Sequence, residues 1–316
     1  MSQALPILTL TLNPTLDLST EVPMLLPDMK LRCSEPLLDP GGGGLNVSRA
    51  IKALGGDSLA LVALGGLTGE RLGGLIRADG LAFLALLGPG ETRTSLTVRD
   101  QASDQQFRFM LPGPTWGEAD RASVFTLLRA TARPGGIGVI SGSQPPGVPP
   151  DFPAHLAQAM AGSRVVLDTS GPALLASVNH PIPGLEVLRM DGIEAETLAG
   201  RPLATRTDTA NFAQELVRRG VAQRVIMARG ADGNVLAEAQ RRLFVNAPLV
   251  RVKSPVGAGD SFMAGLVLAM ARQQTTAEAL RLAAAASAAA VMTDATHLCR
   301  PADVLALLPQ VEVSEI

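Results

Sequence analysis

The chain has 316 residues, of which 47% are hydrophobic, with a formal net charge of −2 and an isoelectric point near 6.0. This much apolar material can bury a large core, as one large domain or as two modest ones. The small net charge gives no general attraction to nucleic acid or to an anionic membrane, so neither is predicted as a partner.

No stretch of the sequence has the pattern of a targeting or membrane-spanning segment. The N-terminus has no basic region before its apolar stretch, which is typical of a first strand rather than a signal peptide. The alanine-rich run 283–292 is too short and too weakly apolar to cross a bilayer. Cys33 and Cys299 have neither metal-ligand spacing nor a disulfide framework. We expect a cytoplasmic protein with two buried thiols.

The first predicted strand, residues 7–12, alternates threonine with aliphatic residues and ends at Asn13-Pro14. Asp17 follows on the carboxyl side of this strand, where open α/β sheets bind their ligands. A binding role for Asp17 and a solvated aspartate in a turn are equally compatible with the sequence.

Residues 18–40 contain several prolines, show no helical periodicity and carry Lys30 and Arg32 at alternate positions. If this segment is a short strand, both side chains point to one face. They would then form either a solvated edge that discourages strand pairing or half of an anion clamp. The residues alone favour the solvated edge.

Four consecutive glycines, 41–44, run directly into an apolar helical pattern. Ordering them costs backbone entropy, so a linker explains them less well than a backbone surface against a polar ligand. Asn46 would be a hydrogen-bonding partner of that ligand. Neither this run nor the one after Gly257 has the third glycine of the dinucleotide fingerprint. No lysine follows a glycine as a Walker A loop requires.

Short apolar strands alternating with helices account for most of the remaining chain. Strands are predicted at 58–64, 81–87, 137–141, 165–168, 185–190 and 224–227, a late hairpin at 235–237 and 242–245, and helices at 68–79, 260–272, 276–292 and about 301–308. This rhythm predicts an α/β fold with a mostly parallel sheet covered by helices on both faces.

Two predicted strands without an intervening helix, 92–98 and 105–111, break this rhythm. Each carries an arginine, Arg93 and Arg108. We expect these strands to join residues 18–40 in a small sheet apart from the main one.

The stretch Gly257-Ala258-Gly259-Asp260 opens an apolar helix. Small residues at a helix start leave its first N–H groups open to a ligand, and these groups carry the positive end of the helix dipole. Asp260 has two possible roles. It is either an ordinary helix cap, or a general base beside an anion hole that deprotonates a hydroxyl while a phosphoryl group arrives.

Taken together, three segments resemble the phosphofructokinase B (ribokinase-like) family of sugar kinases. They are the glycine run with Asn46, the Ser-Gly-Ser-x-Pro-Pro-Gly segment 141–147 and the Gly-Ala-Gly-Asp stretch. Their order and spacing match over nearly the whole chain. Within the family the match is closest to the minor-type bacterial 6-phosphofructokinases, through Lys30-Leu31-Arg32-Cys33, Gln106-x-Arg108-Phe109 and Leu298-Cys299.

The resemblance implies a ribokinase-like three-layer α/β/α domain that spans 1–316. A small β-lid, from segments of about 16–40 and 91–112, would close over the sugar and make a homodimer contact. The implied reaction is the ATP-dependent phosphorylation of a hexose phosphate at a primary hydroxyl, most of all fructose 6-phosphate to fructose 1,6-bisphosphate. A sugar phosphate, ATP and Mg²⁺ are the implied small-molecule partners.

By matching motif, the resemblance implies that Asp260 is the catalytic base and that the backbone of Gly257, Ala258 and Gly259 forms the anion hole. The implied sugar contacts are Asp17, Gly42, Gly43, Asn46 and Ser143, and the implied contacts to its phosphate are Lys30, Arg32, Arg93 and Arg108. Four cations on the lid are more than a neutral sugar needs, and arginine forks match phosphate geometry. The anion clamp is therefore now favoured over the solvated edge.

The nucleotide side departs from the family pattern. The family has Lys-Pro-Asn, then two further residues and Glu, whereas this chain has Arg189-Met190-Asp191 and keeps only Glu194, the implied magnesium residue. Ile193 replaces a lysine expected near the phosphates, and segment 228–230 replaces the usual Ser-Leu-Gly. The implied nucleotide contacts are Arg189, Asp191, Ala228, Gly230, Gly233 and Thr293, the last in place of an asparagine.

Two alternatives to a fructose 6-phosphate kinase stay open. The first is a 1-phosphofructokinase or a tagatose-6-phosphate kinase, with which the segment 254–256 is compatible. The second is a catalytically weak sugar-phosphate-binding protein. The altered segment 189–193 favours this second alternative, whereas the intact stretch 257–260 argues against it.

Overall fold

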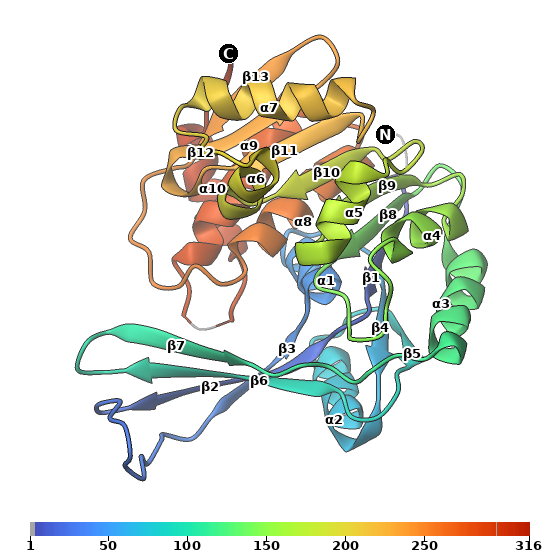
Figure 1. The fold of residues 1–316 in the computed structure, drawn as a ribbon. Helices are drawn as coiled ribbons and strands as arrows, with labels where there is room; N and C mark the ends of the chain where they lie inside the picture. The colour runs from blue at the N-terminus through green and yellow to red at the C-terminus, as the bar shows by residue number, and fades with distance from the viewer. Residues whose placement is uncertain (1–3, 295) are drawn as a thin grey trace.

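The computed structural model describes residues 4–294 and 296–316. Its centre is a ten-stranded sheet with the order β14-β13-β12-β11-β10-β9-β8-β1-β4-β5 (Figure 1). The neighbouring strands from β11 to β5 in this order pair in parallel, whereas β12, β13 and β14 pair antiparallel with their neighbours. This confirms the predicted mostly parallel sheet. The bounds are β1 Ile7–Thr11, β4 Leu59–Leu64, β5 Phe83–Leu87, β8 Ile137–Ser141, β9 Arg164–Asp168, β10 Val187–Met190, β11 Arg224–Ala228, β12 Gly233–Ala237, β13 Arg242–Asn246 and β14 Val313–Glu315.

Helices cover both faces of this sheet, so the fold is the expected three-layer α/β/α arrangement (Figure 1). One face carries α1 Gly43–Ala53, α2 Gly66–Ala78, α8 Ala258–Ala271, α9 Thr276–Val291 and α10 Pro301–Leu307. The other carries α3 Glu118–Thr131, α4 Phe152–Ala159, α5 Gly171–Asn179, α6 Gly192–Ala199 and α7 Arg206–Arg218. Short 3₁₀ turns span Gly230–Asp232 and Leu308–Gln310.

The alternating sequence of β1 feeds both apolar layers. Ile7 packs in the cluster of α1, α8 and α9, whereas Leu8 and Leu10 pack in the cluster of α3, α4 and α5. Thr9 is buried, and its hydroxyl is 2.8 Å from the Ser48 hydroxyl of α1. The polar positions of β1 therefore fix α1 against the centre of the sheet.

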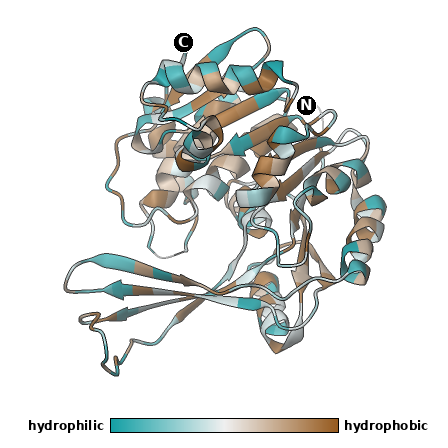
Figure 2. Cartoon of the chain, in the orientation of Figure 1, coloured by the Kyte–Doolittle hydropathy of each residue, from teal (hydrophilic) through white to brown (hydrophobic). Residues whose placement is uncertain are grey.

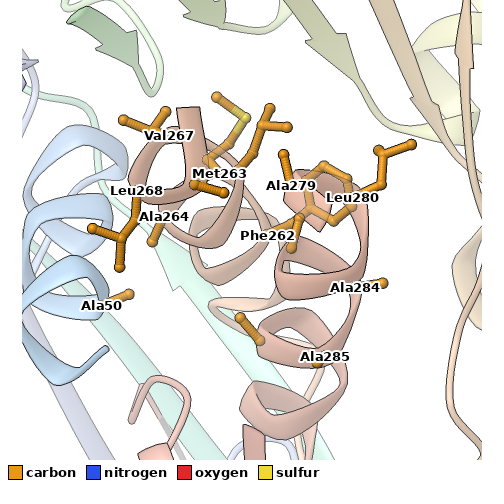
Figure 3. Close-up of a cluster of buried hydrophobic side chains, with 14 of the residues drawn as sticks. Ala50, Phe262, Met263, Ala264, Val267, Leu268, Ala279, Leu280, Ala284 and Ala285 are labelled. Carbon is orange, nitrogen blue, oxygen red and sulfur yellow. The ribbon is translucent and has the colours of Figure 1, made fainter. Parts of the chain in front are cut away.

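Helix α8 is buried along its length, from Ser261 to Ala271. It lies between α1 and the alanine-rich α9, and the small side chains of α9 let the two helices approach closely (Figure 3). At the tightest point a Cβ on Gly265 would be 2.8 Å from the Ala283 Cα atom. This packing explains why α8 is apolar all round, and it holds the N-terminus of α8 at the carboxyl edge of the sheet.

A separate four-stranded sheet, here called the small sheet, has the order β3-β2-β6-β7 and extends away from the main body (Figure 1). Its strands are β2 Thr15–Val22, β3 Leu37–Gly41, β6 Arg93–Asp100 and β7 Gln105–Met110. The register pairs Thr15 with Arg93 and Thr97 with Arg108, so Asp17, Arg93 and Arg108 share one face. The opposite face is largely apolar, with Leu16, Leu18, Leu38, Leu96, Phe107 and Phe109. Figure 2 shows both brown and teal segments along the strands of the small sheet.

Two expectations are wrong, and one of the two alternatives for Asp17 is excluded. Residues 23–36 form no strand, so Lys30 and Arg32 lie exposed on an irregular loop and are not paired on one strand face. Cys33 is exposed on the same loop, and only Cys299 is buried. Asp17 is a half-buried residue of β2 rather than a turn residue, because the chain turns earlier, between Thr11 and Thr15.

The described ranges 4–294 and 296–316 contain no helix that is both long and apolar enough to cross a membrane.

Candidate active site

Two cavities meet at the carboxyl edge of the main sheet. The smaller, of about 160 Å³, is lined by Ser141, Gly142, Ser143, Asp168, Thr169, Ser170, Arg189, Asp191, Glu194 and Asp260. The larger, of about 1010 Å³, lies between α6, the turn after β11, the loop 247–255, the start of α8 and the C-terminal half of α9. Arg189 and Asp191 line both cavities. A group passing from one cavity to the other therefore passes these two side chains.

Asp260 lies on the first turn of α8 but does not cap the helix. The N-cap is Gly257, whose left-handed φ of 76° favours glycine, and a Cβ there would be 2.8 Å from the Leu298 side chain. The Asp260 Oδ2 atom instead accepts a 2.9 Å hydrogen bond from the Asn46 Nδ2 atom of α1. This carboxylate is thus directed into the site, as a general base must be.

The pKa of Asp260 is raised to about 6, mainly because the carboxyl is buried. The nearby charges of Asp168 and Asp17 act in the same direction, whereas the Asn46 hydrogen bond and the Arg189 charge oppose the shift. A carboxyl with this pKa is deprotonated at neutral pH yet basic enough to accept a proton from a reacting group.

Arg189 is the third residue of β10, and its guanidinium lies against the start of α8. Its Nη1 atom is 3.3 Å from the Asp168 Oδ2 atom, and its buried Nε atom has no hydrogen-bond partner among the described residues. A Cβ on Gly259 would be 2.9 Å from Nη1, so only glycine lets the guanidinium lie this close to the α8 backbone. A cation and the open N–H groups of a helix here form one electropositive surface.

The glycine run has a steric explanation beside the expected ligand contact. Gly42 is the N-cap of α1 with φ 119°. A Cβ on Gly43 would be 2.6 Å from the Ser141 hydroxyl, and one on Gly44 would be 2.4 Å from the Leu10 carbonyl oxygen. The start of α1 therefore packs directly on the ends of β1 and β8, which brings Asn46 to Asp260.

Asn13, which the sequence analysis used only to mark the end of the first strand, contacts a residue that lines the smaller cavity. Its Nδ2 atom donates to the Ser143 hydroxyl at 3.2 Å, and its carbonyl oxygen accepts from the Arg93 Nη2 atom at 3.1 Å. It links the segment after β8 to the small sheet.

The small sheet brings Asp17 and two of the four predicted cations together. Burial raises the pKa of Asp17 to about 6, against a Thr15 hydrogen bond and the charges of Arg93 and Arg108. Burial also lowers the pKa of Arg93. Lys30 and Arg32 are exposed and, like Arg108, make no hydrogen bond or ion pair within the described residues.

Asp191 begins α6 as its N-cap. Its Oδ1 atom accepts from the Glu194 N–H at 2.8 Å, and the Glu194 Oε2 atom accepts from the Asp191 N–H at 2.8 Å, a reciprocal capping box. The pKa of Glu194 is raised, first by burial and then by the Asp191 and Asp168 charges. Asp191 therefore caps α6 and adds a negative charge where the family motif has a neutral asparagine.

The described residues contain no group of three or more metal-ligating side chains placed to hold an ion. Mg²⁺ in nucleotide sites, however, is held mainly by phosphates and water, with one or two carboxylates. Asp191 and Glu194 line the smaller cavity and fit that requirement.

The remaining predicted nucleotide residues divide into two pairs. Ala228 and Gly230 line the larger cavity, and Gly230 with φ 58° opens the 3₁₀ turn. Gly233 and Thr293 do not line it. Gly233 has φ 128° and packs against the Val245 carbonyl, and the buried Thr293 hydroxyl is 2.7 Å from the His297 carbonyl.

Arg229, another residue that the sequence did not point to, is a structural clamp. Its guanidinium donates to the carbonyl oxygens of Leu203, Ala204 and Thr205 and to Asp232, at 2.9–3.1 Å. These bonds hold the α6–α7 loop against the turn after β11. The Arg229 guanidinium is therefore engaged in hydrogen bonds within the wall of the larger cavity.

Comparisons with known proteins agree with this geometry. The pattern that describes the pfkB family carbohydrate kinase matches residues 11–303. The chain is 37% identical over 296 residues to the ATP-dependent 6-phosphofructokinase isozyme 2 of Escherichia coli, covering 93% of this chain and 94% of that protein. It is 33% identical over 288 residues to the 1-phosphofructokinase of Xanthomonas campestris, covering 90% of each.

The fold comparison gives a matching result. The crystal structure of the Escherichia coli phosphofructokinase-2 in complex with fructose-6-phosphate superposes with a TM-score of 0.90 at 35% identity. The superposition covers 97% of this chain and 99% of that one.

Proposed function

The chain is a sugar-phosphate kinase that belongs to the pfkB family of carbohydrate kinases, and we propose that it converts fructose 6-phosphate and ATP into fructose 1,6-bisphosphate and ADP. The observation that supports this most is the meeting of the two cavities. Asp260 faces the smaller one, and Arg189 with Asp191 lies where it joins the larger one. Phosphoryl transfer needs an acceptor site and a donor site in line with each other.

In this proposal the free primary hydroxyl of the sugar enters the smaller cavity at Asp260, and the rest of the sugar lies beside that cavity. There Asp17, Asn46 and Ser143 bind its hydroxyls next to the Gly42 and Gly43 backbone. As an O–P bond forms to the terminal phosphorus of ATP, the bridging O–P bond to ADP breaks and the hydroxyl proton moves to Asp260. The raised pKa of Asp260, about 6, suits this proton transfer at neutral pH.

The transferring phosphoryl group lies over the start of α8. The N–H groups of Gly257, Ala258 and Gly259 and the Arg189 guanidinium surround its negative charge. Mg²⁺, carried by the nucleotide phosphates and held by Glu194 and Asp191, would offset charge on the transferred group.

The nucleotide occupies the larger cavity. Ala228 and Gly230 present backbone to it, and the Arg229 bonds keep that wall in place. Gly233 and Thr293 support the site from outside the cavity. Ile193 has no charge, and the Arg229 guanidinium is already bonded to the protein. Binding of the nucleotide phosphates therefore depends on Arg189, the α8 N-terminus and the metal.

The small sheet, from segments of about 16–40 and 91–112, acts as a lid on the single domain 1–316. Arg93 and Arg108 on its polar face clamp the sugar phosphate, with Lys30 and Arg32 supplied by the loop 23–36 as the lid closes. Closure removes water that would otherwise accept the phosphoryl group.

The apolar face of the small sheet forms a homodimer contact in this proposal. Its phenylalanine Phe109 is 48% exposed, and Leu18, Leu38, Leu96 and Phe107 are only half-buried. An exposed apolar sheet face is stabilised by pairing with a second copy of the chain.

The test is ADP release from MgATP with fructose 6-phosphate, fructose 1-phosphate, tagatose 6-phosphate or fructose, with Asp260→Asn as the blank. Turnover on fructose 6-phosphate that disappears in the variant supports the proposal. Turnover on fructose 1-phosphate instead would support the second candidate, 1-phosphofructokinase, which the Xanthomonas campestris relative favours. No ADP from any sugar, with thermal stabilisation by a sugar phosphate retained, would support a binding protein.

A further inference from the structure

Arg49 lies on α1 one turn after Asn46 and has no role in the proposal above. Its side chain is only 13% exposed. The guanidinium makes four contacts to three parts of the fold. It donates to the Asn46 Oδ1 atom at 3.4 Å and to the Pro40 carbonyl oxygen at 2.8 Å, and it pairs with Asp39 at 3.5 Å and Asp79 at 3.1 Å.

The contact with Asn46 decides how that amide is oriented. An asparagine side chain offers one oxygen acceptor and one NH₂ donor. Because Arg49 can only donate, the Asn46 oxygen must face Arg49 and the NH₂ group must face Asp260, where the 2.9 Å bond is found. Rotating the amide by half a turn would break both hydrogen bonds and place an oxygen against a carboxylate.

We propose that Arg49 is a positioning residue that fixes the Asn46 amide and, through it, the carboxylate of Asp260. The contacts to Asp39 and Pro40 extend this arrangement to β3, so the base of the small sheet and the catalytic carboxylate share one support. The inference rests on the proposed role of Asp260 as the base.

The groups that face Asp260 allow a specific test. They are Asp168 from β9, Arg189 from β10, Asp17 from β2 and Asn46 from α1, and Asn46 is the one that lowers the Asp260 pKa by a hydrogen bond. If Arg49 is removed, the amide can rotate and that bond is lost part of the time. The midpoint of Asp260 then moves to higher pH, whereas a merely structural change has no reason to move it.

The experiment titrates side-chain ¹³C-labelled aspartates by NMR in the wild-type chain, Arg49→Leu, Arg49→Lys and Asp79→Asn. The Asp260 signal is identified by its absence in Asp260→Asn. We expect the midpoint to rise by about 0.5–1 pH unit in Arg49→Leu, the usual scale of one lost hydrogen bond to a carboxylate. Arg49→Lys should shift less. Asp79→Asn, which removes the exposed partner and leaves Asn46 bonded, should not shift.

A double-mutant cycle tests the route of the effect. In an Asn46→Ala background, Arg49→Leu should cause no further shift, because the amide through which Arg49 acts is gone. An unchanged midpoint in a folded Arg49→Leu or Arg49→Lys protein would overturn the inference, as would an equal shift in Asp79→Asn. The titration needs no turnover, so an inactive wild-type chain would refute the proposed function and still test Arg49.

Discussion

The Arg189 guanidinium and the Asp168 carboxylate form an ion pair, with Nη1 and Oδ2 3.3 Å apart, directly below the backbone of Gly259. Both side chains are mostly buried, at 14% and 13% exposure. The pair places a fixed cation where the two cavities join, and the Asp168 charge offsets the cost of burying that cation. Arginine at this position therefore depends on the neighbouring carboxylate and glycine.

We expect Arg189→Met to lower kcat by about 10²–10³-fold while the KM for fructose 6-phosphate stays nearly constant. Its cation acts on the charge that develops during transfer rather than on the bound sugar. Arg189→Lys should retain more activity because it keeps the charge. Steady-state kinetics with both substrates varied make the measurement.

Arg164→Met is a matched control for this variant. Arg164 pairs with Glu186 at 2.7 Å, but at the opposite, amino-terminal edge of the sheet. The Arg164→Met variant should be less stable than the wild-type chain and should keep its kcat. Equal losses of kcat in the two variants would mean that Arg189 matters only for folding.

Asp260→Asn should abolish turnover and raise stability at pH 7. The folded pKa of about 6 lies above the ordinary value of 3.8, so the folded chain binds the proton more tightly than the unfolded chain. Stability should fall as pH rises from about 4 to about 6, and the cost is fully present at pH 7. The Asp260→Asn substitution removes this cost, so the free energy of unfolding at pH 7 should rise by roughly 1–3 kcal/mol. Thermal unfolding at pH 4 and pH 7 measures the difference.

The same pKa predicts the acid limb of the activity profile. A base must be deprotonated, so kcat/KM should fall as pH decreases through about 6. Asp17 is expected to titrate in the same range and to contribute through sugar binding. A profile that is flat between pH 5 and pH 7 would contradict Asp260 as the base.

Arg93→Gln and Arg108→Gln should each raise the KM for the sugar phosphate by about 10–100-fold, the scale of a lost charge-assisted contact to phosphate. The KM for ATP should change little. Arg99→Gln is the control, because Arg99 is on the same strand as Arg93 but pairs with Glu21 and Asp104. A rise in the KM for ATP alone would contradict the role of these arginines in binding the sugar phosphate.

The sequence was sufficient to predict the main sheet and to single out several segments that line the two cavities, because both depend on local patterns. Alternation of threonine and aliphatic residues in 7–12 is determined by the two faces of β1. Gly43 and Gly44 shortly before Asn46, and Gly259 directly before Asp260, are required where a helix start packs closely against neighbouring strands. In such cases the local sequence motif is enough to predict the local geometry.

Contacts between distant segments could not be predicted. Arg229 has no local signal, because its partners are carbonyl groups 24–26 residues away. The orientation of Asn46 depends on Arg49, and the bond from that amide to Asp260 joins residues 214 positions apart. Alternate cations at 30 and 32 suggested a strand, but Pro23, Pro27 and Pro36 leave an irregular loop before β3.

The apolar face of the small sheet gives a prediction about assembly. Phe109→Glu should convert the particle from twice the 32.7 kDa chain mass to the single-chain mass, because a charge would be buried in the proposed interface. Light scattering after size exclusion measures this. Leu305→Glu, at an exposed leucine of α10, should leave the mass unchanged. A wild-type chain of single mass would refute the dimer.

Gly43→Ala and Gly74→Ala should have opposite effects on stability, although both place alanine in a helix. At Gly43 the new Cβ would be 2.6 Å from the Ser141 hydroxyl and 2.7 Å from the Gly142 nitrogen, so α1 must move away from β8. Overpacking of this kind costs about 1–3 kcal/mol, and the shift of α1 separates Asn46 from Asp260. At Gly74, in α2, the Cβ meets nothing within 4 Å, and alanine should add roughly 0.5–1 kcal/mol. Chemical denaturation measures both changes. If Gly43→Ala keeps wild-type stability and turnover, the start of α1 is not held by contact with β8.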